Sequence, residues 1–306
     1  IVVSLGEPSG IGPEVFLIAI FETSLKEQLG LITVVASKKV IKNVSQKLNY
    51  HKTDSLKIIE VNLDSDVILG KPDKKNAPYV IECLNKAVDL AHKEKIPLVT
   101  GPINKKVVTN TISGFSGHTE FLKEKFGCED VLMLLANNSL KVGVATTHIA
   151  LKDVPKMISK DLIIRKCKLL DKGLKDIYGL VAPKIAVLGL NPHAGEDGSF
   201  GIEEIESINP AIAHLKKEDF DIVGPISADT AFINGGYDAY LSMYHDQALP
   251  VLKTLDFHHS VNITLGLPFH RVSVDHGTAE DIAPKFKADY TSMLEALKLA
   301  GNGNII

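Results

Sequence analysis

Short apolar runs alternate with longer amphipathic stretches along most of this sequence, and this alternation constrains the fold more than any other feature. The runs show no polar alternation, as in strands that are buried on both faces. Such strands, separated by helices, predict an α/β fold with mostly parallel sheets covered on both sides. Strands are expected at residues 1–5, 31–36, 98–100, 131–136, 141–146, 184–190 and 239–243. Helices are expected at residues 78–93, 116–126, 160–178, 203–217 and 285–300.

The composition predicts a folded protein that does not bind polyanions. Among 306 residues, 34 Lys and Arg face 37 Asp and Glu, so no basic field exists for nucleic acid. The hydrophobic fraction of 45% excludes a disordered chain. No apolar run approaches the roughly 20 residues that span a bilayer, and three cysteines without a CxxC pair predict reduced thiols. We therefore expect a cytoplasmic protein of about two domains without a membrane segment.

Two loops that follow expected strands allow more than one interpretation. The first, GEPSGIGPE at residues 6–14, is Gly-rich and opens a helix. It could cradle an anion, or it could be a tight strand-to-helix turn with Pro13 near the helix start, and it matches no standard phosphate-loop motif. The second contains Lys105 in the run GPINKK. This lysine is suited to phosphate binding or proton transfer, but a solvated surface lysine is the simpler interpretation.

Three histidines, His148, His193 and His245, each follow an expected strand. Carboxyl ends of parallel strands meet at one edge of a sheet, where α/β proteins bind ligands. Three neutral imidazoles suit Zn²⁺ or a similar divalent ion and leave a coordination position open for catalysis. Asp246 is then either an outer partner of His245 or a base. The alternative for each histidine is an ordinary loop or packing role.

Further polar residues occur in contexts that suit an anionic substrate. His118 and Thr119 precede a helix, where they could bind a phosphate or where Thr119 could cap the helix. Cations set in apolar surroundings need a partner, which a substrate or an internal carboxylate would supply. Such surroundings are found around Lys253, Asn262 and Arg271.

Nine motifs, in one order along nearly the whole chain, resemble those of the 4-hydroxythreonine-4-phosphate dehydrogenase family of pyridoxal-phosphate biosynthesis. They are GEPSGIGPE, TGPINK, GFSGHTEFL, TTHIAL, NPHAGEDGSFG, GPISADTAF, YHDQALPVLK, VNITLGLPFHR and VDHGTAEDIA. Two positions depart from the family pattern, Ala248 and Pro284, where the family more often has Gly.

The resemblance implies two α/β/α domains with an active-site cleft between them, as in isocitrate and isopropylmalate dehydrogenases. The first domain would comprise residues 1–112 and 270–306, and the second, residues 113–269, would carry most metal and dimer contacts. The resemblance also implies a homodimer whose active site lies at the interface of the two chains, so that one histidine ligand can come from the partner chain.

The implied reaction is an NAD-dependent oxidation of 4-phosphooxy-L-threonine at its C3 hydroxyl, followed by decarboxylation to 3-amino-2-oxopropyl phosphate. NADP is possible, and the divalent metal would be Zn²⁺, with Mg²⁺, Co²⁺ or Mn²⁺ as alternatives. The implied metal ligands are His148, His193 and His245. The implied substrate contacts are His118, Thr119, Lys253, Asn262 and Arg271. The implied cofactor loop is Asp275, His276, Gly277, Thr278 and Ala279. Asp246 and Lys105 are the two candidates for the proton acceptor.

Other functions fit parts of the same pattern. A paralogue that oxidises D-threonate or D-erythronate 4-phosphate would keep the metal and phosphate residues. A three-histidine zinc hydrolase would use a metal-bound hydroxide and no NAD. An acyltransferase related to phosphate acetyltransferase would share the fold without NAD or metal. A non-catalytic binding protein fits least, because so many polar groups follow the strands.

Overall fold

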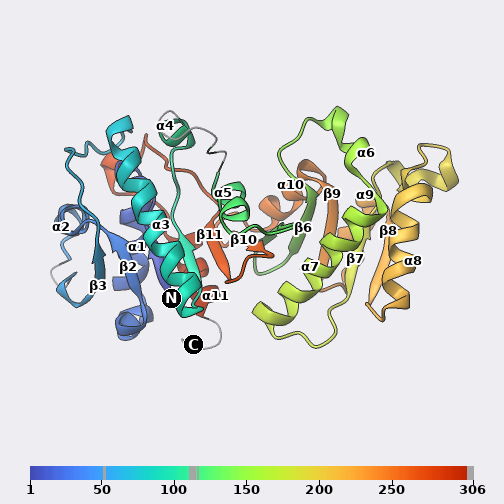
Figure 1. Ribbon diagram of the computed structural model, residues 1–306, viewed down its shortest axis with the longest axis horizontal. Helices are drawn as coiled ribbons and strands as arrows, with labels where there is room; N and C mark the ends of the chain where they lie inside the picture. The colour runs from blue at the N-terminus through green and yellow to red at the C-terminus, as the bar shows by residue number, and fades with distance from the viewer. Residues whose placement is uncertain (51–52, 110–114, 116, 302–306) are drawn as a thin grey trace. The chain divides into compact units, whose positions relative to one another are not determined.

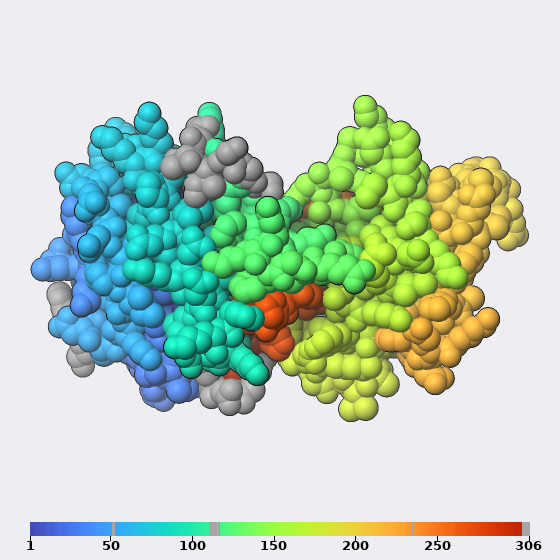
Figure 2. All heavy atoms as spheres, viewed as in Figure 1, coloured from blue at the N-terminus to red at the C-terminus, as the bar shows by residue number. Residues whose placement is uncertain are grey.

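The computed structural model describes residues 1–50, 53–109, 115 and 117–301. The chain forms two compact units (Figures 1 and 2): Ile1–Gly127 with Leu267–Ile306, and Cys128–Gly266. The expected domain boundaries lie after residues 112 and 269, whereas the two units of the structure meet after residues 127 and 266. Residues 117–127 fall in the first unit because Leu122 is buried in its core, and residues 267–269 do so because Phe269 joins the same apolar cluster.

The sheet of the first unit has five strands in the order β3-β2-β1-β4-β11, and its pairs are parallel. The central strands are buried on both faces, which explains their unbroken apolar sequences. The strands are β1 (Val2–Ser4), β2 (Thr33–Ala36), β3 (Lys57–Glu60), β4 (Leu98–Thr100) and β11 (Arg271–Val274).

In the described residues, six α-helices accompany this sheet. The longest of them, α3, has a proline, Pro78, in its first turn, where no N–H partner is needed, and is followed by Lys95 in a left-handed conformation. Its apolar face packs on β1 and β2 through Leu84 and Val88. Helix α11, drawn in red in Figure 1, packs against α1 and β11. The helices are α1 (Gly12–Phe21), α2 (Lys38–Lys47), α3 (Ala77–Glu94), α4 (Lys105–Thr109), α5 (His118–Lys125) and α11 (Thr291–Gly301).

The second unit is built from the middle of the chain around a six-stranded sheet of order β10-β5-β6-β9-β7-β8. Strand β5 runs antiparallel to β6 and β10, and the other pairs are parallel. The strands are β5 (Leu132–Ala136), β6 (Lys141–Thr146), β7 (Ile185–Leu188), β8 (Ile222–Ile226), β9 (Ala239–Tyr244) and β10 (Val261–Leu265). The helices are α6 (Val154–Met157), α7 (Lys160–Tyr178), α8 (Asn209–Lys217), α9 (Ala228–Asn234) and α10 (His245–Leu255).

The mostly parallel α/β fold expected from the sequence is confirmed, and two expected helices differ in extent. The stretch 203–217 begins as a π-helical turn, Glu204–Ile208, because Pro210 lacks the N–H that a continuous α-helix needs. The stretch 285–300 becomes helical only at Thr291, since Phe286 has a left-handed backbone with φ of 52°. All three cysteines carry free thiols, as expected. Within the described ranges, no helix combines the length and apolarity required to cross a membrane.

Candidate active site

Arg271, the first residue of β11, is the centre of a cationic cluster in the first unit. Its side chain is only 3% exposed and donates from Nε and Nη2 to Thr100 Oγ1, at 3.2 and 2.8 Å. Burial lowers the pKa of the Arg271 guanidinium to about 10, and the negative charge of Glu120 partly opposes this shift. At neutral pH the guanidinium is therefore charged, buried and suited to binding an anion.

His118 lies close enough to this guanidinium and to Lys105 to be affected by both charges. His118 opens α5, and its pKa falls well below the ordinary value because of burial and because of the positive charges of Arg271 and Lys105. Lys105 Nζ lies 3.4 Å from the position that a Cβ on Gly117 would take. The structure thus brings together three of the predicted site residues, with His118 neutral and able to donate one N–H.

Thr119 lies half-buried in the first turn of α5. The residue that precedes the helix is Gly117, and no side chain caps this terminus. The alternative role for Thr119, a helix cap, is therefore wrong.

The neutral state of His118 predicts a pH dependence of stability. Because its pKa is lower in the folded chain than in the unfolded chain, the unfolded chain binds the extra proton below about pH 6.5. The free energy of unfolding should therefore fall by about 1 kcal/mol between pH 7.5 and pH 5.5 from this group alone. Urea denaturation at the two pH values should show a smaller fall in the free energy of unfolding for His118→Gln than for the wild type. His258→Gln, which changes an exposed histidine, should keep the wild-type pH dependence, and an equal effect of both variants would contradict the prediction.

The loop Asp275–Ala279, predicted to bind the cofactor, is held by contacts within the first unit. The Ile11 N–H donates to the Thr278 carbonyl at 3.0 Å. Thr278 Oγ1 and Asn104 Nδ2 both donate to Glu280 Oε1, at 2.6 and 2.8 Å. Asn104 also accepts from the Val107 N–H at the start of α4. Asn104 therefore links helix α4, which carries Lys105, to Glu280. Glu280 in turn holds the predicted cofactor loop through Thr278.

His276 leaves a buried ring nitrogen available in this loop. Its Nδ1–H donates to the Gly277 carbonyl at 2.9 Å, and its buried Nε2 has no hydrogen-bond partner among the residues that the structure describes. Burial lowers the pKa of His276. A buried imidazole nitrogen without a partner is costly unless a ligand supplies one, so the loop fits a bound cofactor.

The Gly-rich loop at residues 6–14 proves to be a packing element. A Cβ on Gly6 would lie 2.0 Å from the Pro102 carbonyl oxygen, and a Cβ on Gly10 would lie 2.8 Å from that of Thr278. The fully buried Glu7 carboxylate accepts from the Ser9 N–H and hydroxyl, so a carboxylate already occupies the donors that an anion would use. Of the two interpretations, the structure supports the tight turn.

The second unit carries the three predicted metal ligands at the ends of β6, β7 and β9. The rings of His148 and His245 have centroids 6.1 Å apart. Two imidazoles that share a metal at about 2.0–2.1 Å per bond have a similar separation. His245 Nδ1 and Asp246 Oδ1 lie 2.6 Å apart, which fixes the ring and leaves Nε2 for a metal.

The ring of His193 packs near that of Phe200, with centroids 6.2 Å apart. Asp229 lies close enough to His193 to be affected by its charge: the Ser227 hydroxyl and, to a lesser extent, His193 lower the pKa of the Asp229 carboxyl. Within the described part of the chain, no three His, Cys, Asp or Glu side chains gather as a metal site. The structure therefore brings two of the three predicted ligands together.

Lys253 and Asn262 lie in the second unit, on α10 and β10. The ammonium of Lys253 lies 5.6 Å from the centroid of the Phe257 ring, a cation–π distance. Asn262 pairs with Leu135 in the antiparallel ladder. Both side chains are half-buried.

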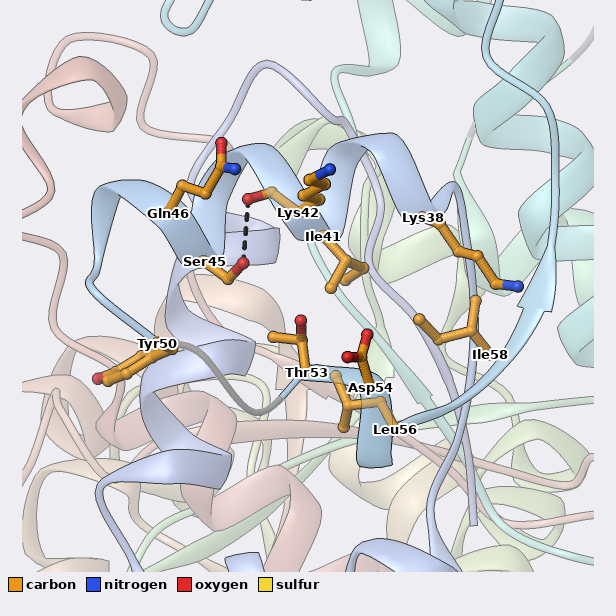
Figure 3. A pocket seen from close by; sticks show the side chains of 10 residues that line it. All are labelled: Lys38, Ile41, Lys42, Ser45, Gln46, Tyr50, Thr53, Asp54, Leu56 and Ile58. Atoms are coloured by element: carbon orange, nitrogen blue, oxygen red, sulfur yellow. Dashed lines mark hydrogen bonds between the residues drawn. The ribbon is translucent and has the colours of Figure 1, made fainter.

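One described cavity of the first unit lies beside α2. It has a volume of about 640 Å³ and lies between α2 and the chain around Thr53–Ile58 (Figure 3). A smaller one of about 260 Å³ lies on the other side of α2 and includes Pro8. None of the predicted site residues lines either cavity.

Comparisons with known proteins agree with the motifs. The model of the family described as "Pyridoxal phosphate biosynthetic protein PdxA" matches residues 15–300. The chain belongs to the PdxA family. It is 42% identical to the 4-hydroxythreonine-4-phosphate dehydrogenase of Yersinia enterocolitica, over 98% of this chain and 95% of that protein. It is 40% identical to the enzyme of the same name from Colwellia psychrerythraea, over 99% and 97%. The crystal structure of the Klebsiella pneumoniae enzyme superimposes with a TM-score of 0.87, at 32% identity and 98% coverage of each chain.

Several residues around the site of this PdxA-family chain escaped the sequence analysis. Glu120 lies in the same GHTE run as His118 and was a detectable signal. Thr100 and Asn104 lie within the TGPINK motif, but the motif does not show their role, because it depends on contacts with residues more than 170 positions away. Glu204 was also missed, and its contacts are described below.

Proposed function

We propose that this chain oxidises 4-phosphooxy-L-threonine at its C3 hydroxyl with NAD⁺, and that the resulting β-keto acid loses CO₂ to give 3-amino-2-oxopropyl phosphate. This places it in pyridoxal-phosphate biosynthesis. The observation that carries the proposal is the buried guanidinium of Arg271 beside His118 and Lys105 in a chain of the PdxA family. A doubly anionic phosphate with a nearby carboxylate is the class of substrate that such a cluster binds.

The residues divide into binding and proton-transfer roles. Arg271 binds an anionic group of the substrate through its charged guanidinium, while neutral His118 and the Thr119 hydroxyl donate hydrogen bonds to the substrate. Lys253 and Asn262 are proposed as further substrate contacts. The acceptor of the C3 hydroxyl proton is Lys105 or Asp246. Since Asp246 Oδ1 already contacts His245 Nδ1, Asp246 also serves to orient that imidazole.

The donor set of His148, His193 and His245 fits a divalent metal, and Zn²⁺ before Mg²⁺, Co²⁺ or Mn²⁺, because the ligands are imidazoles. When bound, such a metal lowers the pKa of a coordinated hydroxyl and polarises the carbonyl formed from it. Asp246 holds the ring of His245 in the tautomer that leaves Nε2 for the metal. The third histidine of each site would come from the partner chain of a homodimer.

A homodimer with the active site at its interface is supported by the surface around these histidines. Large apolar side chains that are 41–67% exposed flank His148 and His193 in the second unit. Large exposed apolar side chains in such number, close in sequence to the proposed ligands, fit an interaction surface. They are Ile149, Leu151, Met157, Phe200, Ile202 and Ile205.

The cofactor is NAD, with NADP as the alternative, and the loop Asp275–Ala279 would hold it. The buried Nε2 of His276 supports this role because it needs a ligand partner. NAD supplies the redox chemistry, and the chain orients it. The free thiols support a cytoplasmic location.

One assay tests the proposed reaction. Purified protein with NAD⁺ and a divalent metal should produce NADH, followed by absorbance, when 4-phosphooxy-L-threonine is added. D-threonate 4-phosphate serves as the matched substrate, since it lacks the amino group but keeps the phosphate. A preference for the sugar acid would assign the chain to the paralogous reaction, and absence of NADH with both substrates would refute the dehydrogenase function.

A further inference from the structure

We propose that Glu204 is a positioning residue for His193, acting through the left-handed turn Pro192–Gly198. The inference rests on the proposed role of His193 as a metal ligand. It adds that the location of this ligand is set by a buried carboxylate that does not itself belong to the ligand set.

The turn that carries His193 has an unusual backbone. Five consecutive residues, His193–Asp197, have φ between 41° and 82°, and only Gly195 among them is a glycine. A left-handed backbone is strained for residues other than glycine, because the Cβ crowds the carbonyl oxygen. Such a conformation persists only where the surrounding structure enforces it, and these conformations cluster at functional sites. The contacts that enforce this turn therefore determine where the His193 ring lies.

Glu204 supplies those contacts at the start of the turn. Its side chain is only 2% exposed, and its Oε1 accepts the N–H groups of Leu190 and Asn191 at 2.7 and 2.8 Å. Its Oε2 accepts from Asn191 Nδ2 at 2.9 Å. Inside the turn, the backbone of Gly195 approaches so closely that an added Cβ would lie 2.7 Å from the same Oε2. The carboxylate thus contacts both the start and the middle of the turn.

The neighbouring Glu203 offers a built-in comparison. Its Oε2 accepts from Asn191 Nδ2 at 2.8 Å, but no backbone N–H of the turn's start bonds to it in the described structure. It is half-buried, whereas Glu204 is buried. Burying a carboxylate is costly unless its hydrogen bonds compensate, and those of Glu204 go to Leu190 and Asn191. Glu204 therefore fixes the backbone at the start of the turn, whereas Glu203 contacts only the side chain of Asn191.

The same strand end is also tied to His245. Gln247 Nε2 donates to the Gly189 carbonyl at 2.6 Å, and Gln247 Oε1 accepts the Met243 N–H at 2.7 Å. Gly189 directly precedes the segment that Glu204 holds. Glu204 and Gln247 therefore fix the end of β7 from two sides, and the loop of His193 is placed relative to the helix that His245 opens.

Zinc affinity of the full-length chain tests the proposal without an activity measurement. We expect Glu204→Ala to bind Zn²⁺ about 10- to 100-fold more weakly in competition with a chelating dye, the loss typical of residues that orient metal ligands. Glu204→Gln keeps one oxygen for both backbone N–H groups and should restore most of the affinity. Glu203→Ala should remain within about twofold of the wild type. Co²⁺ substitution should show an altered d–d absorption spectrum only in Glu204→Ala.

Each other outcome has a defined meaning. Wild-type affinity in Glu204→Ala, or an equal loss in Glu203→Ala, would overturn the positioning role. If Glu204→Ala does not fold, Gly195→Ala decides, because it disturbs the same contact from the turn: weaker Zn²⁺ binding supports the proposal, and unchanged binding overturns it. His193→Ala tests the ligand role of His193 separately from the positioning role of Glu204. Wild-type affinity in that variant would refute His193 as a ligand, whatever Glu204 does.

Discussion

Replacing Arg271 with Ala should lower kcat/KM for 4-phosphooxy-L-threonine by about 100- to 1000-fold, mainly through KM. A hydrogen bond between charged partners contributes about 1.5–3 kcal/mol, and the guanidinium can make two of them to one anion. Because the substrate's anionic groups do not change during hydride transfer, the contact is equal in the ground state and the transition state. The loss therefore falls on substrate binding, as KM and initial NADH rates would show.

Two variants make this prediction specific. Arg271→Lys keeps the charge without the planar fork and should recover only part of the loss. Arg165, the other arginine of the sequence, forms an exposed pair with Asp130 at 3.4 Å. Arg165→Ala should leave kcat/KM within about twofold, since exposed ion pairs contribute little. A loss in kcat alone for Arg271→Ala, with KM unchanged, would contradict a binding role.

Much of the fold could be predicted because burial on both faces leaves a direct trace in the sequence. Strands β1, β4 and β6 are apolar runs whose residues are nearly all buried. Strand β3 escaped prediction because its four residues, Lys57–Glu60, are exposed or half-buried and begin and end with a charge. The helix expected over residues 203–217 differs in extent because of Pro210, whose effect is not part of the apolar periodicity.

The candidate site was predictable to the extent that its residues lie within distinctive local motifs. His118 and Arg271 were found in this way, and the structure places them together in one unit. The left-handed turn at His193 was not predictable, since four of its five residues are not glycine, and His and Asp are only moderately enriched at positive φ. Its cause is Glu204, whose importance depends on three-dimensional contacts rather than on local sequence.

Replacing Gly6 with Ala should destabilise the first unit by more than about 4 kcal/mol, in the range of the most damaging single substitutions. Gly6 has φ of 80°, and a Cβ there would lie 2.0 Å from the Pro102 carbonyl oxygen and 2.7 Å from its carbon. That oxygen also accepts the Glu7 N–H at 2.9 Å. The methyl group therefore adds left-handed strain and forces two loops apart, which breaks this hydrogen bond.

Two other glycines of the first unit separate the effect of left-handed strain from the effect of the steric clash. Gly127 also has a positive φ, of 58°, but no atom lies within 4 Å of its Cβ position, so Gly127→Ala should cost only about 1–2 kcal/mol. Gly30 has neither constraint, and Gly30→Ala should stay within about 0.5 kcal/mol of the wild type. Calorimetric melting should rank the variants in this order, with Tm falling by about 2–4 °C per kcal/mol. If Gly6→Ala melted like Gly127→Ala, the two loops would have room to separate, and close packing against Pro102 would not be the role of Gly6.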